Sequence, residues 1–249
     1  MRMRAFAWAG AGLFGASLAA FAYLHATAWG RPAPPATNVL AAVSADLALF
    51  TTFALHHSIL ARAGAKRWLT RRVPPALERT LYVWVASLLF LAVCGLWRPL
   101  PGMAWDASGA AGALLRLTQL TGLVLTWRSA ARLDIWDLAG IRQVERGSAH
   151  GGSAPTPRAA AEAAPTAMDA PLESGGPYGW VRHPIYLGWV LIVWAVPVMT
   201  QTRLLWAVVS TAYLIVAIPI EERGLVAEFG ATYRDYQRRV RWRLVPGIW

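Results

Sequence analysis

An uncharged apolar stretch occupies residues 5–29, which read AFAWAGAGLFGASLAAFAYLHATAW. A helix of this length, at about 1.5 Å of rise per residue, crosses the roughly 30 Å hydrocarbon core of a bilayer. Five further apolar stretches follow, at residues 38–60, 80–97, 110–131, 184–200 and 204–220. The pattern predicts an all-α, polytopic membrane helix bundle with about six transmembrane helices, forming a single integral-membrane domain over residues 1–249.

The basic residues are distributed unevenly around these stretches. Lys and Arg number 24 against 13 acidic residues, which gives a net charge of +11. With a cytoplasmic N-terminus, 20 of the 24 fall on the cytoplasmic side, as the positive-inside rule expects. We therefore expect a multi-pass protein of a bacterial inner (cytoplasmic) membrane, with both termini cytoplasmic, whose partner is the lipid bilayer and no nucleic acid. A cleaved signal peptide is the alternative interpretation of the first stretch.

Two charged residues lie inside the apolar stretches. Asp46 and Arg116 occur at similar depths, counted from the outer ends of their stretches. Charges within a bilayer seldom lack a partner, so we expect these two side chains to pair. The alternative is that Arg116 extends to the membrane interface.

Three features suggest chemistry but have simpler explanations. Gly10-Ala-Gly12-Leu-Phe-Gly15 has the spacing of a dinucleotide-binding motif, but no strand precedes it, so we expect close helix packing instead. His56 and His57 would point roughly 100° apart on a helix, and no H-x-x-H or H-x-x-x-H pair occurs in the chain. The single cysteine, Cys94, lies inside an apolar stretch. No metal site is therefore expected.

Two segments are harder to explain by packing alone. Residues 176–188 read GPYGWVRHPIYLG and lead into an apolar stretch, with Pro184 suited to the first helical position. The N–H groups that follow it attract anions, and Arg182 and His183 would add to that field. Glu221 and Glu222 lie where the last stretch leaves the membrane, a costly place for charge that also opposes the helix dipole. Together they would suit a ligand with a carboxylate and a positive centre, such as S-adenosylmethionine.

The remaining segments carry two further expectations. Between Leu225 and Val240, apolar and aromatic residues recur at helical spacing with arginines among them, which predicts a C-terminal interfacial helix. Residues 147–176 are rich in Ala, Pro, Gly and Ser and hold almost no large apolar side chain. We expect them to form a flexible cytoplasmic loop.

Several motifs resemble one superfamily of membrane enzymes. They are Gly176-Pro-Tyr178, Arg182-His183-Pro184-x-Tyr186-x-Gly188, Glu221-Glu222, Phe229-Gly230-x-x-Tyr233-x-x-Tyr236 and Pro246. Their order is similar to the C-terminal signature of the isoprenylcysteine carboxyl methyltransferase superfamily. Upstream motifs look like the methanethiol S-methyltransferase branch and its denitrification-associated membrane relatives, namely Phe53-Ala-Leu-His-His57-Ser58, Arg62, Glu78-Arg79, Tyr82 and Asp137-Leu-x-Gly140-Ile-Arg142.

This resemblance implies an S-adenosyl-L-methionine-dependent methyltransferase whose cofactor binds residues 177–246. The cofactor-binding residues would be Tyr178, Arg182, His183, Pro184, Tyr186, Gly188, Tyr233 and one or both of Glu221 and Glu222. The methyl acceptor would be a small or lipophilic nucleophile, preferably a thiol.

Three further residues that match the family motifs are our catalytic candidates. His57 would take the acceptor's proton, or else be a structural histidine bonded to a backbone carbonyl. Arg62 and Arg142 would favour the thiolate form of the acceptor, or else only anchor their helices.

Two other functions remain open at this point. The C-terminal signature also resembles that of membrane sterol reductases, which use NADPH. The family relatives also suggest a non-enzymatic membrane accessory of nitrogen-oxide respiration. Only the methyltransferase is expected to bind S-adenosylhomocysteine, and only the reductase NADPH.

A deletion tests the predicted loop. Its residues offer too little apolar surface to offset an ordering cost of roughly 1–2 kcal/mol per residue, so removing about twenty of them should leave cofactor binding intact. Titration of the purified deletion variant with S-adenosylhomocysteine measures this. Loss of binding would show that the loop is part of the site.

Overall fold

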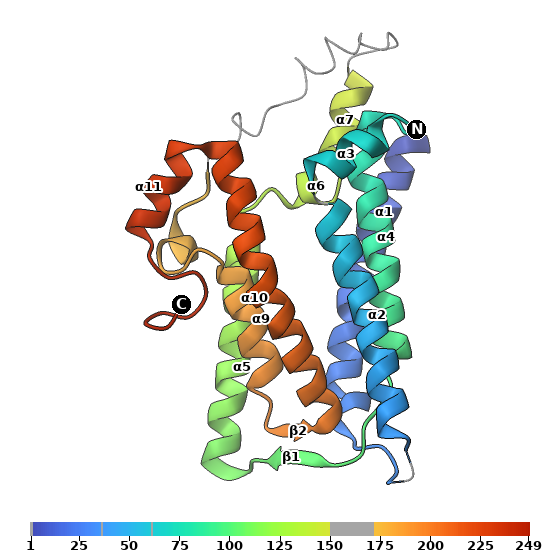
Figure 1. Ribbon diagram of the computed structural model, residues 1–249, viewed down its shortest axis with the longest axis vertical. Helices are drawn as coiled ribbons and strands as arrows, with labels where there is room; N and C mark the ends of the chain where they lie inside the picture. The colour runs from blue at the N-terminus through green and yellow to red at the C-terminus, as the bar shows by residue number, and fades with distance from the viewer. Residues whose placement is uncertain (1, 36, 61, 150–171) are drawn as a thin grey trace.

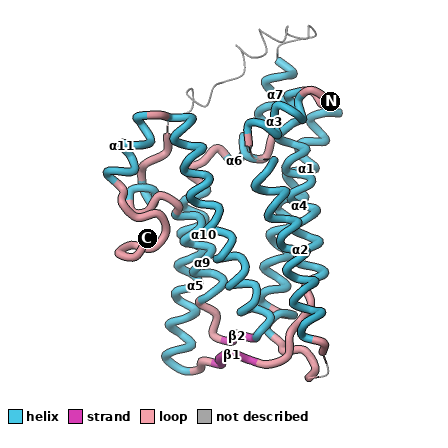
Figure 2. The backbone as a smooth tube through the Cα atoms, in the orientation of Figure 1, coloured by secondary structure: helices cyan, strands magenta, loops and turns pink. Residues whose placement is uncertain are grey.

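The computed structural model describes residues 2–35, 37–60, 62–149 and 172–249, and most of these residues are helical (Figure 2). The long helices are α1 (Arg2–Ala26), α2 (Val39–Leu60), α4 (Pro75–Leu96), α5 (Gly109–Ala130), α9 (Pro184–Trp194) and α10 (Gln201–Phe229). The short ones are η1 (Ala28–Gly30), α3 (Ala63–Thr70), α6 (Ile135–Leu138), α7 (Ile141–Ala149), η3 (Gly176–Gly179) and α11 (Ala231–Arg239). Strands β1 (Met103–Asp106) and β2 (Val198–Thr200) pair antiparallel.

Four helices of the described chain, α1, α2, α4 and α10, are long and apolar enough to cross a membrane. The predicted count of six is therefore not reached by this measure. The stretch at 184–200 is helical only as far as Trp194, where α9 ends ahead of Pro197 and the strand β2. α5 has 22 residues but carries Arg116, Gln119 and several threonines, which lower its mean hydropathy. The last helix is longer than predicted, because α10 continues past Pro219 to Phe229.

The long helices form two groups that stand side by side (Figure 1). Helices α1, α2 and α4 make one group, and α5, α9 and α10 make the other. The two strands lie at one end of the molecule, while the N-terminus, α3, α7 and α11 lie toward the other. An aromatic core joins the groups, with Phe21 of α1 stacked on Trp189 and Trp206 at centroid distances of 4.8 and 5.3 Å. Trp206 is fully buried there.

A buried arginine at the strand end links the two groups through hydrogen bonds. Arg203 at the start of α10 donates to the carbonyl oxygen of His25 from Nε at 2.9 Å, and to that of Ala26 from Nη2 at 3.2 Å. These carbonyls end α1, where they lack helical donors and where the helix dipole favours a cation.

The predicted pairing of Asp46 with Arg116 is wrong. Asp46 is fully buried, and its Oδ1 accepts a hydrogen bond from the backbone N–H of Arg98 at 2.8 Å, just beyond the end of α4. Among the described residues no ion pair joins Asp46 to Arg116, whose helix α5 belongs to the other group. Asp46 therefore holds the turn after α4 rather than a charge on α5.

Close backbone approaches explain only some of the glycines. A Cβ on Gly188 of α9 would lie 2.7 Å from the carbonyl oxygen of Gly122 in α5, so these helices pack through their backbones. The expected packing of the Gly10–Gly15 motif holds for Gly10, where a Cβ would lie 2.8 Å from Nε1 of Trp84. A Cβ at Gly12 or Gly15 would have no neighbouring atom within 4 Å, so their part of the prediction is not confirmed.

Both edges of the expected loop at 147–176 belong to the described structure. Helix α7 continues to Ala149, Leu172 packs near Tyr233 and Tyr236, and Gly176 begins η3. Residues 150–171 lie outside the described residues.

The α5–α9 contact yields a prediction about stability. Gly188→Ala places a methyl group against backbone atoms of α5, so it should destabilise the fold by about 1–3 kcal/mol. Gly15→Ala, at a helical position with open space, should stabilise by up to about 1 kcal/mol through helix propensity. Thermal unfolding in detergent, followed by tryptophan fluorescence, compares the two variants. Equal midpoints would contradict the proposed tight packing at Gly188.

Candidate functional site

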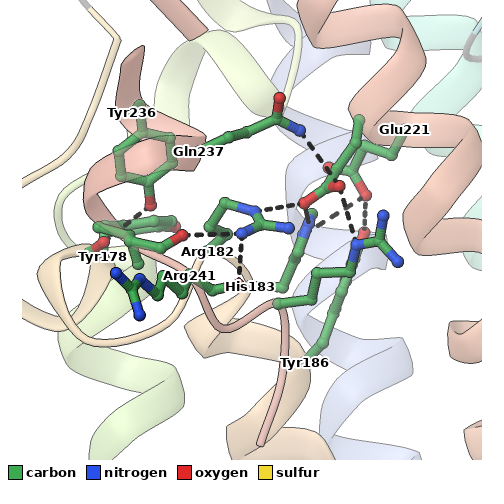
Figure 3. Close-up of polar contacts among 11 residues, drawn as sticks. Tyr178, Arg182, His183, Tyr186, Glu221, Tyr236, Gln237 and Arg241 are labelled. Carbon is green, nitrogen blue, oxygen red and sulfur yellow. Dashed lines mark hydrogen bonds and ion pairs between the residues drawn. The ribbon is translucent and has the colours of Figure 1, made fainter. Parts of the chain in front are cut away.

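A buried carboxylate organises the end of α10 opposite the strands. The side chain of Glu222 is 4 % exposed and accepts four side-chain hydrogen bonds. The donors are Nε of Arg182 at 2.6 Å, Nε2 of His183 at 3.3 Å, Nε of Arg243 at 3.1 Å and Nε2 of Gln237 at 3.4 Å. Three of the donor residues, Arg182, His183 and Gln237, are labelled in Figure 3. Charge-assisted bonds of this kind offset the cost of burying the carboxylate. Both oxygens of Glu222 are thereby committed to protein partners.

Further hydrogen bonds of Arg182 and His183 dock the C-terminal segment on the start of α9. The backbone N–H groups of Arg182 and His183 donate to the carbonyl oxygens of Trp242 and Arg243, each at 2.9 Å. Nη1 of Arg182 donates to the carbonyl oxygens of Val240 and Arg241 at 2.7 and 2.8 Å. Pro184, which is buried, then begins α9 as the sequence predicted. One arginine thus connects three segments of the chain.

Glu221 is the open member of the acidic pair. Its side chain is 43 % exposed, it accepts a hydrogen bond from the Tyr186 hydroxyl at 2.8 Å, and its Oε2 lies 4.0 Å from Nδ1 of His183. The rings of His183 and Tyr186 stack with centroids 5.4 Å apart and planes within 2°. Glu221 therefore keeps acceptor capacity that Glu222 has used.

Buried tyrosines lie beside the two glutamates. The Tyr236 hydroxyl donates to the carbonyl oxygen of Tyr178 at 2.7 Å, and Tyr233 is 1 % exposed. Burial, aided by the nearby carboxylates of Glu173 and Glu221, raises the pKa of Tyr178 to about 12. Burial also raises the pKa of Tyr233 above its ordinary value. These hydroxyls consequently stay protonated at neutral pH, and that of Tyr178 lies 3.5 Å from the carbonyl oxygen of Ser129, to which it donates.

A second polar group lies where the two helix groups meet. Nδ1 of His57 on α2 lies 2.8 Å from the Tyr82 hydroxyl on α4. The neighbouring Ser58 reaches across to α10, with its Oγ 3.0 Å from the Tyr213 hydroxyl. Tyr213 precedes Glu221 by eight residues on α10, which is about two helical turns. The Ser58–Tyr213 contact thus places the end of α2 that carries His57 against the part of α10 that leads to Glu221.

The other sequence candidates lie in different surroundings. Arg142 forms an ion pair with Asp134 through Nε at 2.7 Å, on helix α7, which packs against α1 and α4 rather than α10 (Figure 1). Arg62 is exposed at the start of α3. Gly188 lies in the α5–α9 contact. The structure does not bring Arg142 to the cluster around Glu221.

Several residues of these clusters were not among the sequence candidates. They are Ser58, Tyr82, Tyr213, Gln237 and Arg243. Ser58 and Tyr82 stood in the family motifs without an assigned role, and a hydroxyl inside an apolar stretch was the available signal for Tyr213. No local pattern marked Gln237 or Arg243, because their role depends on how the C-terminal segment folds back.

The described residues hold no group of three or more His, Cys, Asp or Glu side chains that could bind a metal ion. Cys94 is a buried free thiol in the aromatic core between the helix groups.

Comparison with known proteins gives a consistent assignment. The phospholipid methyltransferase family matches residues 165–232. Methanethiol S-methyltransferase 2 of Bradyrhizobium diazoefficiens is 40 % identical over 215 residues, covering 85 % of this chain and 76 % of that protein. Methanethiol S-methyltransferase of Mycobacterium tuberculosis is 40 % identical over 204 residues, covering 80 % and 76 %. Human nurim is 27 % identical over 195 residues, covering 76 % and 70 %. No solved structure matches.

Apolar helices together with these matches define a helical membrane methyltransferase. The chain belongs to the family of the methanethiol S-methyltransferases, within the superfamily that includes the isoprenylcysteine carboxyl methyltransferases.

The role of Glu222 yields a prediction about stability. Glu222→Gln removes the charge that four donors share and leaves buried cations uncompensated, so it should cost about 3–5 kcal/mol. Asp235→Asn, which removes an exposed pair with Arg238, should cost no more than about 1 kcal/mol. Thermal unfolding and limited proteolysis of the segment after Gly230 measure both variants. A Glu222→Gln protein as stable and as protease-resistant as Asp235→Asn would contradict this role.

Proposed function

We propose that this protein transfers a methyl group from S-adenosyl-L-methionine to a small thiol, at the cytoplasmic end of its helices in a bacterial inner membrane. The observation that carries the proposal is the open carboxylate of Glu221, which lies beside Tyr186. The helix that carries Glu221 also carries Tyr213, which contacts Ser58, the neighbour of His57. The names of the relatives support the thiol as acceptor.

The residues present suit the cofactor, which carries a sulfonium, an ammonium and a carboxylate. Glu221 would accept hydrogen bonds from the ammonium or the ribose hydroxyls, because it has free acceptor capacity. The N–H groups at the start of α9, behind Pro184, would attract the carboxylate. Arg182 and His183 lie at this helix start, and the guanidinium of Arg182 keeps its positive charge there although Nε donates to Glu222. Tyr178 and Tyr186 would contact the cofactor. Glu222, Gly188 and Tyr233 would hold the surrounding segments in place.

The cofactor supplies an activated methyl group on a positively charged sulfur. His57 would take the proton of the acceptor thiol, because only the thiolate is an effective nucleophile. The new bond joins the acceptor sulfur to the methyl carbon, and the electron pair of the broken bond stays on the departing sulfur. The proton then leaves His57 for the cytoplasm. Alignment and exclusion of water are the main contributions of the remaining residues.

Cations near His57 would favour the thiolate. Arg62 follows His57 by five residues and keeps this proposed role. Arg142 is a weaker candidate, because its guanidinium already neutralises Asp134. The guanidinium of Arg79 lies 5.2 Å from the ring centroid of Tyr82, whose hydroxyl contacts His57.

The proposal includes six membrane crossings with both termini cytoplasmic. β1 leads into α5 and β2 follows α9, and the two strands are paired at one end of the molecule. α5 and α9 therefore run from that end toward the end that carries α7 and α11 (Figure 1), and the 11 residues of α9 reach only part of the way. α5 has 22 residues, and at about 1.5 Å of rise per residue this length covers a bilayer core.

The function is tested by supplying the purified protein in lipid with labelled S-adenosylmethionine and several acceptors. Methanethiol and longer alkyl thiols should take up label, whereas a prenylated cysteine and a phospholipid amine should not. Label only in the carboxyl ester or the lipid would overturn the thiol assignment. No label anywhere, with no binding of S-adenosylhomocysteine, would overturn the methyltransferase proposal. Binding of NADPH instead would point to a reductase.

Glu221 yields a prediction about cofactor binding. Glu221→Gln keeps the shape of the side chain but loses its charge, so S-adenosylhomocysteine should bind on the order of tenfold more weakly, the loss expected for one charge-assisted contact. Glu228→Gln, at an exposed position two turns further along α10, is the matched control and should bind normally. Calorimetric titration measures both dissociation constants. Equal affinity in the two variants would remove Glu221 from the cofactor site.

A further inference from the structure

The two ring nitrogens of His57 are in different environments. Nδ1 contacts the Tyr82 hydroxyl at 2.8 Å, whereas Nε2 has no hydrogen-bond partner in the described part of the chain. The ring of His57 also stacks on Phe53, with centroids 5.5 Å apart and planes 30° from parallel. Its plane is therefore fixed between α2 and α4, and only Nε2 is available for an external group.

The Tyr82 hydroxyl touches two atoms of the same histidine. Besides Nδ1, it lies 3.4 Å from the carbonyl oxygen of His57, a second acceptor to which it can donate its single proton. Helix α2 ends at Leu60, so this carbonyl belongs to the last turn, where helix carbonyls run short of donors. When the hydroxyl proton points to the carbonyl, the hydroxyl oxygen presents a lone pair to Nδ1. The ring proton must then be on Nδ1, and Nε2 keeps its own lone pair.

The opposite arrangement would disable the histidine as a base. If Tyr82 donated its proton to Nδ1, a neutral imidazole would carry its hydrogen on Nε2. That nitrogen could then give a proton but could not accept one. The direction of a single hydroxyl bond thus decides whether His57 can activate a thiol.

We propose that Tyr82 is a positioning residue that holds His57 in the Nδ1–H tautomer, so that Nε2 receives the proton of the methyl acceptor. This inference rests on the proposed function and adds to it a residue that does not itself touch the acceptor. The acceptor's S–H bond breaks, its proton moves to Nε2, and the electron pair stays on sulfur for the attack on the methyl carbon.

Other titratable groups also face this contact. On α2, the His56 ring stacks on Tyr82 with centroids 5.9 Å apart. On α4, Glu78 and Arg79 interact with Tyr82 electrostatically. Tyr213 and Glu221 do so from α10. The effect of Tyr82→Phe on the pH profile is therefore assigned to His57 only when Tyr82→Phe has no further effect in a His57→Ala background.

A double-mutant cycle tests the proposal in the full-length protein in lipid. His57→Ala should lower kcat/KM for a thiol acceptor by on the order of 10²-fold or more, as loss of a general base does. Tyr82→Phe should lower it about tenfold when His57 is present and have no further effect in the His57→Ala background, because coupled residues are non-additive. Tyr23→Phe, the same change at an exposed site of α1, should leave the rate unchanged. Affinity for S-adenosylhomocysteine should be the same in all four variants.

The pH profile gives a second kinetic readout. Without a working base the reaction depends on thiolate formed in solution, so kcat/KM of Tyr82→Phe and His57→Ala should rise with pH up to the pKa of the acceptor. An equal loss from Tyr82→Phe in both backgrounds would show a structural role and overturn the proposal.

A spectroscopic measurement keeps the inference testable apart from catalysis. Nitrogen NMR of ring-labelled histidine, with His57 assigned by its loss in His57→Ala, distinguishes the two tautomers. The proposal expects Nδ1–H in the wild-type protein and loss of that preference in Tyr82→Phe. Nε2–H in the wild-type protein would overturn it. Failure to methylate any thiol would contradict the proposed function, while the tautomer result would still decide the role of Tyr82.

Discussion

The ion pair between Glu222 and Arg182 is the interaction on which the rest of this site depends. A carboxylate buried this deeply is tolerated only when its oxygens are satisfied, and here the donors come from the start of α9, from α11 and from the segment that follows it. Arg182 in turn binds the backbone of that segment. The charge of Glu222 therefore fixes three pieces of chain in one arrangement. Its neighbour Glu221 is left exposed beside them.

The space between the two helix groups changes character along its length. Toward the strands it is filled by stacked aromatic rings around Trp206, which bind the groups together through apolar burial. Toward the other end, hydroxyls and imidazoles replace these rings, and Ser58 and Tyr213 make a polar contact between the groups. An acceptor with an alkyl body and a reactive sulfur would suit this boundary, because aromatic rings pack favourably against both alkyl groups and sulfur. The proposed chemistry thus lies where the apolar core ends.

Sequence reasoning succeeded where local chemistry decides the structure. Pro184 begins a helix because a proline has no N–H to leave unpaired, and long uncharged stretches form long helices. The adjacent glutamates drew attention because charge is costly at that place. The separate roles of Glu221 and Glu222 were open, since which of two adjacent acids turns inward depends on donors more than ten residues away in the chain.

The errors have the same origin. Asp46 was expected to pair with a distant charge but bonds to a backbone N–H after α4, a partner that depends on tertiary contact. The apolar stretch at 184–200 does not form one helix, because α9 ends at Trp194 ahead of Pro197 and strand β2 begins at Val198. Local patterns located these residues without specifying their partners.

The central claim is that the cofactor binds at the helix ends that Glu222 holds together, and hydrogen exchange of the protein in lipid tests this most directly. Saturating S-adenosylhomocysteine should slow amide exchange in residues 178–188 and 221–243, with no change in residues 98–106 at the strand end. This pattern would place the ligand on the docked C-terminal segment. Protection confined to the strand end, with the ligand bound, would contradict the account.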